Sequence, residues 1–127
     1  MKYLLDTNLF LEILLGQTNA QRCKAFLRER GDESVISDFS LNSIGVLLFR
    51  EGKEDVFHRF VLDVLPHLRV VTLSQALYSE VQKWHRQHNL DFDDSYQCCV
   101  ASEYNLTVVT LDADFEQVRK SLPVVSV

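Results

Sequence analysis

The sequence predicts a three-layer α/β fold, with helices covering both faces of a parallel sheet of about five short strands. Two observations lead to this prediction. Short apolar runs typical of buried strands alternate with longer segments whose apolar residues recur at helical spacing. Acidic residues follow directly after several of these runs. Strands that alternate with helices imply right-handed crossovers, which make the strands parallel and cover the sheet on both sides.

The length and composition indicate one domain spanning residues 1–127. The chain has 46% hydrophobic and 24% charged residues, as is usual for a globular protein. Lys2 precedes only three apolar residues before Asp6, too few for a signal peptide, and no apolar run is long enough to cross a bilayer. We therefore expect a cytoplasmic protein without a membrane segment. The three cysteines, two of them adjacent, form neither a disulfide framework nor a Cys-x-x-Cys site.

In the first half of the chain, apolar runs mark the strands, and glycines and capping residues mark the helix ends. Strands are predicted at Tyr3–Leu5 and Ser34–Ser37, each followed directly by an aspartate. Thr18-x-x-Gln21 is a capping-box signal, and glycines follow the first two helices. The predicted helices span residues 9–15, 18–30, 40–50 and 54–65, the third of them capped by Ser40.

The second half continues the alternation. Strands are predicted at residues 69–72 and 107–110, with a last edge strand at 124–125 after Pro123, where proline is tolerated. Ser74 is placed to cap a helix that runs to His88. Another helix spans residues 95–104, opened by Asp91-Phe-Asp-Asp94 and ended by Asn105 as the residue after the cap.

Five aspartates stand where predicted strands end or predicted helices begin, and they are spread over most of the chain. They are Asp6, Asp38, Asp94, Asp112 and Asp114. The carboxyl ends of parallel strands share one edge of the sheet, and ligands of open α/β sheets bind there. We therefore expect these side chains to converge, although Asp6 taken alone is better interpreted as a helix cap.

Such a convergence is electrostatically unfavourable without a counter-ion. Two like charges about 4 Å apart repel by about 4 kcal/mol at an effective dielectric constant of about 20. Oxygen ligands without Cys or His suit Mg²⁺ or Mn²⁺, and these ions serve phosphate chemistry by activating water. The net charge is −5, so five carboxylates account for the whole acidic excess. A nucleic-acid substrate is therefore not excluded.

Three segments in register give the chain a family resemblance. Tyr-Leu-Leu-Asp-Thr-Asn8, Asp94-Ser-Tyr-Gln-Cys-Cys-Val-Ala101 and Thr-Val-Val-Thr-Leu-Asp-Ala-Asp-Phe115 together resemble a PIN domain, over essentially the whole chain. The resemblance implies a parallel sheet between helices and a metal-dependent ribonuclease acting on RNA. It further implies a homodimer and a VapC-like toxin that is paired with an antitoxin protein.

The resemblance also implies roles for individual residues. Asp6 matches the first metal-binding acid of the family, Asp94 the third and Asp112 the fourth, while Asp114 matches an additional acid. Three polar residues would support this site: Thr7 and Asn8 beside the first acid, and Thr110 as a hydrogen-bonding group.

The second acid is where the chain departs from the family pattern. The family usually carries a glutamate in the helix after the second strand, but here Ser43 occupies that place, with Asn42 beside it. Asp38, about one helical turn earlier, either takes over as a metal ligand or is a helix-start residue that complements the helix dipole. Both interpretations remain open.

Four basic residues on predicted helix ends and faces are candidates for binding RNA near the metal site, or are ordinary solvated charges: Arg50, Lys53, Lys83 and Arg86. Two other functions compete with the ribonuclease. One is a PIN-like module that binds RNA or protein without cleaving RNA, and the missing glutamate is the observation that favours it. A phosphatase with Asp6 as nucleophile would need a second aspartate two residues later, where Asn8 stands instead.

Overall fold

The computed structural model describes residues 1–127 and contains one sheet of five parallel strands. The strands lie in the order β3-β2-β1-β4-β5, so the chain starts in the middle of the sheet and extends it to both sides. The bounds of the strands are β1 (Tyr3–Leu5), β2 (Ser34–Ser37), β3 (Arg69–Val71), β4 (Thr107–Thr110) and β5 (Val124–Ser126). The predicted α/β fold is confirmed.

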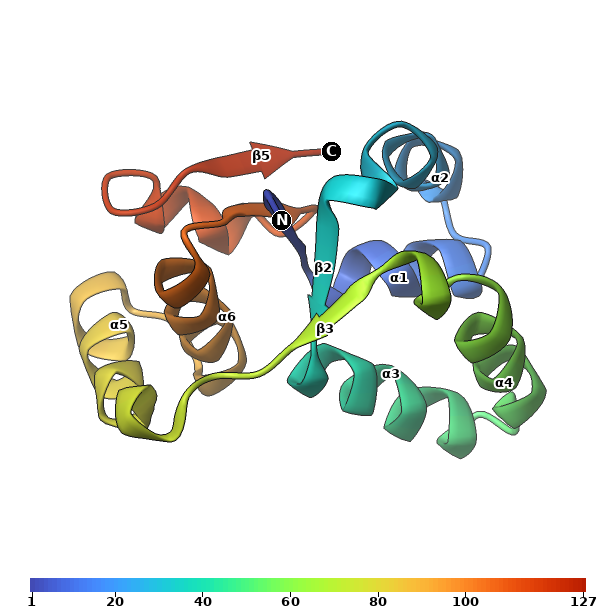
Figure 1. Cartoon of the computed structure of the whole chain (residues 1–127), viewed down its shortest axis with the longest axis horizontal. Helices are drawn as coiled ribbons and strands as arrows, with labels where there is room; N and C mark the ends of the chain where they lie inside the picture. Colours follow the sequence, from blue (N-terminus) through green and yellow to red (C-terminus); the bar gives the residue numbers. More distant parts are fainter.

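Helices cover both faces of this sheet (Figure 1). On one side lie α1 (Thr7–Leu14), α2 (Ala20–Arg30), α3 (Asp38–Arg50) and α4 (Glu54–Asp63), and on the other α5 (Val81–His88) and α6 (Phe92–Tyr104). Four short 3₁₀ helices complete the chain: η1 (Gly31–Glu33), η2 (Leu65–His67), η3 (Gln75–Glu80) and η4 (Ala113–Val118). None of the helices combines the length and apolar character that a membrane crossing requires.

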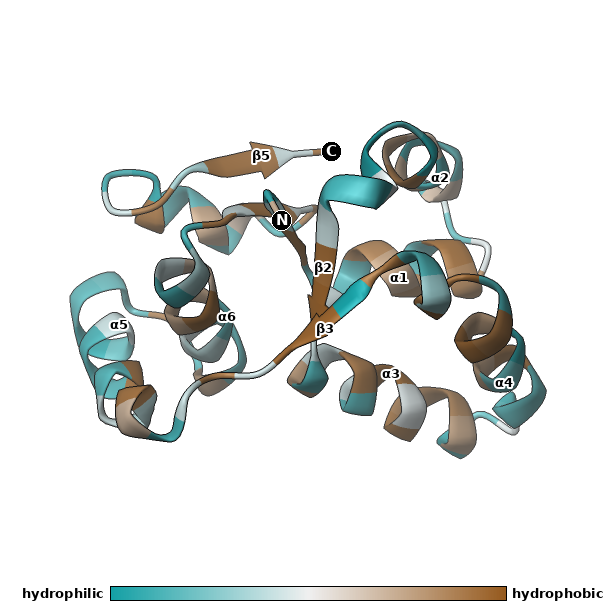
Figure 2. Ribbon diagram, viewed as in Figure 1, coloured by the Kyte–Doolittle hydropathy of each residue, from teal (hydrophilic) through white to brown (hydrophobic).

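The strands are apolar on both faces because each face packs against its own helical layer. On β1, Leu4 belongs to the core that includes α6, whereas Tyr3 and Leu5 belong to the core that includes α1 to α4. Successive strand residues point to opposite faces, so three neighbouring apolar residues serve two cores. Figure 2 shows hydrophobic stretches in β2 and β5 and hydrophilic residues along much of α5.

Three helices near the carboxyl edge of the sheet begin earlier than the sequence predicts, and α6 does so by starting at Phe92 rather than at Ser95, with Asp91 as its cap. Helix α1 begins at Thr7 rather than at Leu9, because the Asp6 carboxylate accepts the Thr7 N–H at 2.9 Å and is the cap. Helix α3 is capped by Ser37, which accepts the Ser40 N–H at 3.1 Å. The prediction that Ser40 caps this helix is therefore wrong.

Further along the chain, the predicted helix from Ser74 to His88 is divided. Its first part is the 3₁₀ helix η3, and only the second part is the α-helix α5. The capping box predicted at Thr18 does not form, because α2 begins at Ala20 with Asn19 as its cap. Asn105 does end α6 in the left-handed conformation, with φ of 56°, as predicted.

Candidate metal centre

Asp6 ends β1 at the centre of the sheet and is held by donors from three segments. Its side chain is buried, with Oδ1 accepting from the Thr7 N–H at 2.9 Å and from Gln97 Nε2 at 3.4 Å. The other oxygen, Oδ2, accepts from the Thr110 hydroxyl at 2.8 Å. Both oxygens are thus oriented by hydrogen bonds that tie β1 to β4 and α6.

Three further carboxylates meet beside this position. Asp94, Asp112 and Asp114 each offer an oxygen, and these oxygens lie within 4.8 Å of one another. Asp94 stands in the first turn of α6, where its backbone N–H donates a hydrogen bond to Oδ1 of the cap residue Asp91 at 3.0 Å. Asp112 caps η4 and accepts the Asp114 N–H at 2.9 Å. The cap of α6 and the turn after β4 therefore bring chain-distant acids together.

The charges of these acids act on one another. The pKa of Asp94 is raised to about 7, first by burial and then by the nearby charges of Asp6, Asp91, Asp112 and Asp114. Burial also raises the pKa of Asp6, against the opposing effect of its three hydrogen bonds. Asp6 and Asp94 thus hold their protons more tightly than exposed carboxyls do, as expected for acids that are buried beside like charges.

The donor set fits a hard divalent cation. No Lys or Arg side chain forms an ion pair with any of these acids, since the four salt bridges of the chain lie elsewhere. Carboxylate oxygens are the ligands that Mg²⁺ and Mn²⁺ prefer, and no Cys or His belongs to the group. Such a cation would offset the repulsion among Asp94, Asp112 and Asp114.

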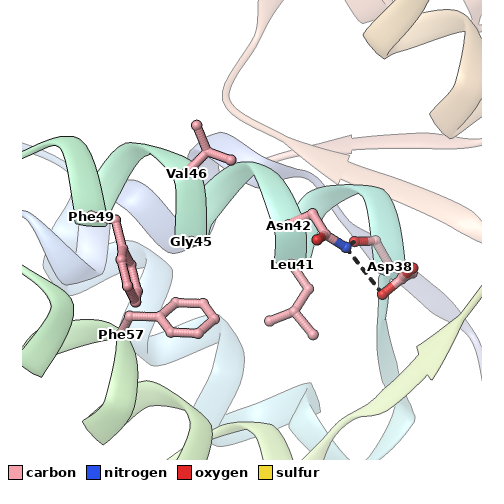
Figure 3. Close-up of a pocket in the computed structure, with 7 residues that line it drawn as sticks. All are labelled: Asp38, Leu41, Asn42, Gly45, Val46, Phe49 and Phe57. Carbon is pink, nitrogen blue, oxygen red and sulfur yellow. Dashed lines mark hydrogen bonds between the residues drawn. The ribbon is translucent and has the colours of Figure 1, made fainter.

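Asp38 lies apart from this group. It is the first residue of α3, is exposed, and accepts a hydrogen bond from Asn42 Nδ2 at its backbone oxygen (2.9 Å) and at its carboxylate (3.3 Å). Figure 3 shows Asp38 and Asn42 at one end of a pocket that runs along α3 to Phe49 and Phe57. Its carboxylate is not among the oxygens that gather within 4.8 Å. A metal-binding role for Asp38 stays a prediction.

Gln97 is a site residue that the sequence did not single out. It is only 2% exposed, and its Nε2 donates to the Ser40 hydroxyl at 2.7 Å as well as to Asp6. The Thr7 hydroxyl donates to the same Ser40 oxygen at 2.7 Å. Gln97 Oε1 is buried without a hydrogen-bond partner. The available signal was its spacing, since Gln97 follows Asp94 by three residues and therefore shares its helix face.

The remaining supporting residues join the ends of β1 and β4. Thr110 accepts the Asp112 N–H at 2.9 Å while its hydroxyl donates to Asp6, so it links two acids of the site. Asn8 Oδ1 accepts the Leu111 N–H at 3.5 Å. Ser43, at the place of the family's glutamate, is half-buried and lines a groove between α1 and α3 with Thr7.

The four basic candidates do not gather at one place. Arg50 lines the groove that begins at Thr7, and Lys53 precedes α4 on the same side of the sheet. Lys83 and Arg86 lie on α5, on the opposite side, and Lys83 is paired with Glu80 at 2.9 Å. The structure therefore separates them into two pairs, one on each side of the sheet (Figure 1).

Solved structures with the same fold include a toxin-antitoxin complex and a toxin. FitAcB from Neisseria gonorrhoeae is 26% identical, with a TM-score of 0.76 over 96% of this chain and 95% of that chain. A toxin-antitoxin complex from Klebsiella pneumoniae is 18% identical, with a TM-score of 0.79 over 98% and 96%. VapC20 from Mycobacterium tuberculosis, described as a sarcin-ricin loop cleaving toxin, is 16% identical, with a TM-score of 0.77 over 91% and 93%.

The sequence itself shows the family. No curated protein matches this chain. The profile of the PIN domain, however, matches residues 3–121, which include β1 to β4 and all the acids of the candidate metal centre. The chain therefore belongs to the PIN domain family.

Proposed function

We propose that this protein is a Mg²⁺- or Mn²⁺-dependent endoribonuclease that hydrolyses RNA phosphodiester bonds as the toxin of a toxin–antitoxin pair. The observation that carries the proposal is the meeting of Asp94, Asp112 and Asp114 within 4.8 Å beside the buried Asp6. Membership of the PIN domain family and the description of VapC20 as a toxin that cleaves the sarcin-ricin loop support a nuclease and an RNA substrate.

The chain's own residues would prepare the site for this reaction. Asp94, Asp112 and Asp114 would hold the cation, and Asp6 would add its charge from a position fixed by Thr110. A bound Mg²⁺ or Mn²⁺ supplies water activation and stabilises the leaving oxygen of a phosphodiester. Because the pKa of Asp94 is about 7, a proton competes with the cation for this carboxylate near neutral pH. No protein nucleophile is needed.

The antitoxin and a second copy of the chain are the partners we propose. Support for the antitoxin comes from the structural likeness to the Klebsiella pneumoniae toxin-antitoxin complex. The homodimer follows from the family resemblance alone. Reading the gene next to this one tests the antitoxin, and sedimentation of the purified chain tests the dimer.

A binding module that does not cleave RNA is the second candidate. The observation that favours it is the place of the family's glutamate, where Ser43 supplies no carboxylate. The phosphatase has less support, because Asp6 is 6% exposed and both of its oxygens accept hydrogen bonds. A nucleophile needs an accessible oxygen.

Cleavage of a mixed-sequence single-stranded RNA, with Mn²⁺ or Mg²⁺ against EDTA, tests the proposal. We expect metal-dependent cutting by the wild type and a loss of at least about 100-fold in Asp6→Asn. Asp38→Asn decides the open role of Asp38. If Asp38→Asn loses as much cleavage activity as Asp6→Asn, Asp38 is a metal ligand. If cleavage is unchanged, Asp38 is only a helix-start residue. If the wild type never cuts varied RNAs above background, the binding module takes the place of the nuclease.

A further inference from the structure

Four aromatic rings from three segments gather next to the first turn of α6. Phe39 of α3 lies 5.2 Å from Tyr96 and 6.1 Å from Phe92, measured between ring centroids. Tyr78 of η3 lies 6.0 Å from Tyr96. Together with two polar residues of α3, these rings line a cavity of about 280 Å³, which we call the aromatic pocket: Asp38, Phe39, Asn42, Tyr78, Phe92 and Tyr96.

The aromatic pocket combines one buried ring with two rings that are exposed to solvent. Tyr96 is buried, and its hydroxyl accepts the Leu73 N–H at 3.3 Å, which holds the ring in place. In contrast, 54% of Phe92 and 50% of Tyr78 are exposed to solvent. Large aromatic side chains that stay exposed around a cavity are typical of binding surfaces, because a ligand can cover them.

The aromatic pocket and the candidate metal centre lie on the same edge of the sheet. Tyr78 follows β3, Phe39 follows β2, Asp6 follows β1 and Asp112 follows β4, which is the order of the strands themselves. Strands are about 4.8 Å apart, so the ends of β2 and β4 are separated by about 10 Å. A polynucleotide bound at the acids would therefore pass the aromatic pocket.

The lining of the pocket indicates which part of a nucleotide it takes. It contains no Lys or Arg, and Asp38 would repel a phosphate. Aromatic faces stack with nucleobases, and carboxylates and amides bond to their polar edges. The Asn42 amide nitrogen is already bonded to Asp38, so the Asn42 oxygen and the Asp38 carboxylate remain as acceptors for a base amino group.

We propose that the aromatic pocket binds an unstacked nucleobase of single-stranded RNA, beside the phosphodiester that is cut. This inference rests on the proposed ribonuclease function. Phe92 and Tyr78 stack on the base, Tyr96 and Phe39 hold them in position, and Asp38 and Asn42 select a base that carries an amino group. A base in a regular duplex does not reach the pocket, so the pocket selects single-stranded or looped RNA.

Binding of a single-stranded RNA that carries 2-aminopurine tests the inference separately from cleavage. Ca²⁺ replaces Mg²⁺ and Mn²⁺ so that the strand stays intact, and stacking is read as quenching of the 2-aminopurine fluorescence. We expect Phe92→Ala to weaken binding by about 5- to 150-fold and to remove most of the quenching. Phe49→Ala is the matched control, since Phe49 is 61% exposed and lies at the far end of α3.

A second variant separates stacking from packing. Phe92→Leu keeps an apolar side chain but removes the ring, so it should lose quenching as Phe92→Ala does, with an unchanged Tm. If Phe92→Leu binds RNA and quenches the fluorescence like the wild type, the proposal that a base stacks on the Phe92 ring is wrong. If the Phe92 variants instead change only the sedimentation of the protein, the pocket is a protein interface and the inference is overturned.

The same experiment distinguishes failure of the pocket from failure of the proposed function. A wild type that binds and cuts RNA while Phe92→Ala binds equally well refutes only the aromatic pocket. A wild type that neither binds nor cuts RNA refutes the ribonuclease, and the pocket with it.

Discussion

Asp94 is the residue of the candidate metal centre whose protonation changes near neutral pH. Its pKa rises from the ordinary 3.8 to about 7, mainly through burial and then through the charge of Asp6. A carboxyl with a higher pKa in the folded than in the unfolded chain stabilises the fold only while it is protonated. Its contribution is complete below about pH 4 and is lost as the pH rises through about 7.

Asp94→Asn should therefore stabilise the metal-free protein above pH 7 and have little effect at pH 4. Because Asp94 is only partly buried, solvent screens the repulsion, and we expect a gain of about 1 kcal/mol, or about 4 °C in Tm. Thermal unfolding in EDTA at several pH values measures it. Asp55→Asn is the control, an exposed acid in the first turn of α4, and should give no gain at any pH. An equal effect of both variants would contradict the coupling.

Gln97 shows why single residues of the site escape sequence reasoning. Glutamine is usually exposed, yet this one is buried and bonds to Asp6 and Ser40. The acids were easier to find, because each directly follows a strand or opens a helix. The partner of a polar residue inside a helix is set by which other helix faces it, and this contact between α6 and α3 is not a local property of the sequence.

Helix starts are the elements where prediction and structure differ most. Asp6, Thr7 and Asn8 all favour a cap position, so their composition alone does not select Asp6. Ser37 and Ser40 are equally ambiguous, and the structure uses Ser37. A shift of one residue turns a side chain by about 100° around the helix axis. The direction of Asp38 was for this reason beyond what the sequence can determine, whereas the strands, marked by apolar runs, were predicted to within one or two residues.

The packing of α3 against α4 yields a prediction at Gly45. A Cβ there would lie 3.2 Å from a ring carbon of Phe57, a tight contact (Figure 3). The Phe57 ring is half-buried and borders a pocket, so it has room to turn. Alanine is favoured over glycine in a helix by about 1 kcal/mol. We expect Gly45→Ala to raise Tm by about 2 °C, after the cost of moving the ring.

A valine at position 45 tests how large a side chain this position tolerates. Gly45→Val adds two methyl groups toward Phe57 and has a lower helix propensity, so it should lower Tm. If Gly45→Ala lowers Tm as much as Gly45→Val, the Phe57 ring cannot turn and the expected gain is wrong. Adding Phe57→Leu to both variants would then restore Tm.

At the scale of the whole molecule, topology brings the acids together. Strands β1 and β4 are adjacent and parallel, so their carboxyl ends place Asp6 near Asp112. The first turn of α6 places Asp94 close to both of these acids. This convergence was predictable, because parallel strands share one carboxyl edge. The distribution of the basic residues was not. Arg50 and Lys83 lie on different sides of the sheet, and this depends on which face each crossover covers.

Because the acids repel one another, a bound cation should stabilise the entire fold. A ligand present at 100 times its dissociation constant adds about 2.7 kcal/mol, which corresponds to a rise of about 10 °C in Tm for a chain of this size. We expect Mn²⁺ to raise Tm at pH 8 and to do so less at pH 6, where Asp94 is mostly protonated. Asp112→Asn should remove most of the rise. Asp63→Asn should leave it intact, because Asp63 pairs with Arg59 at the surface of α4. A rise that persists in Asp112→Asn would place the bound Mn²⁺ outside this group of acids.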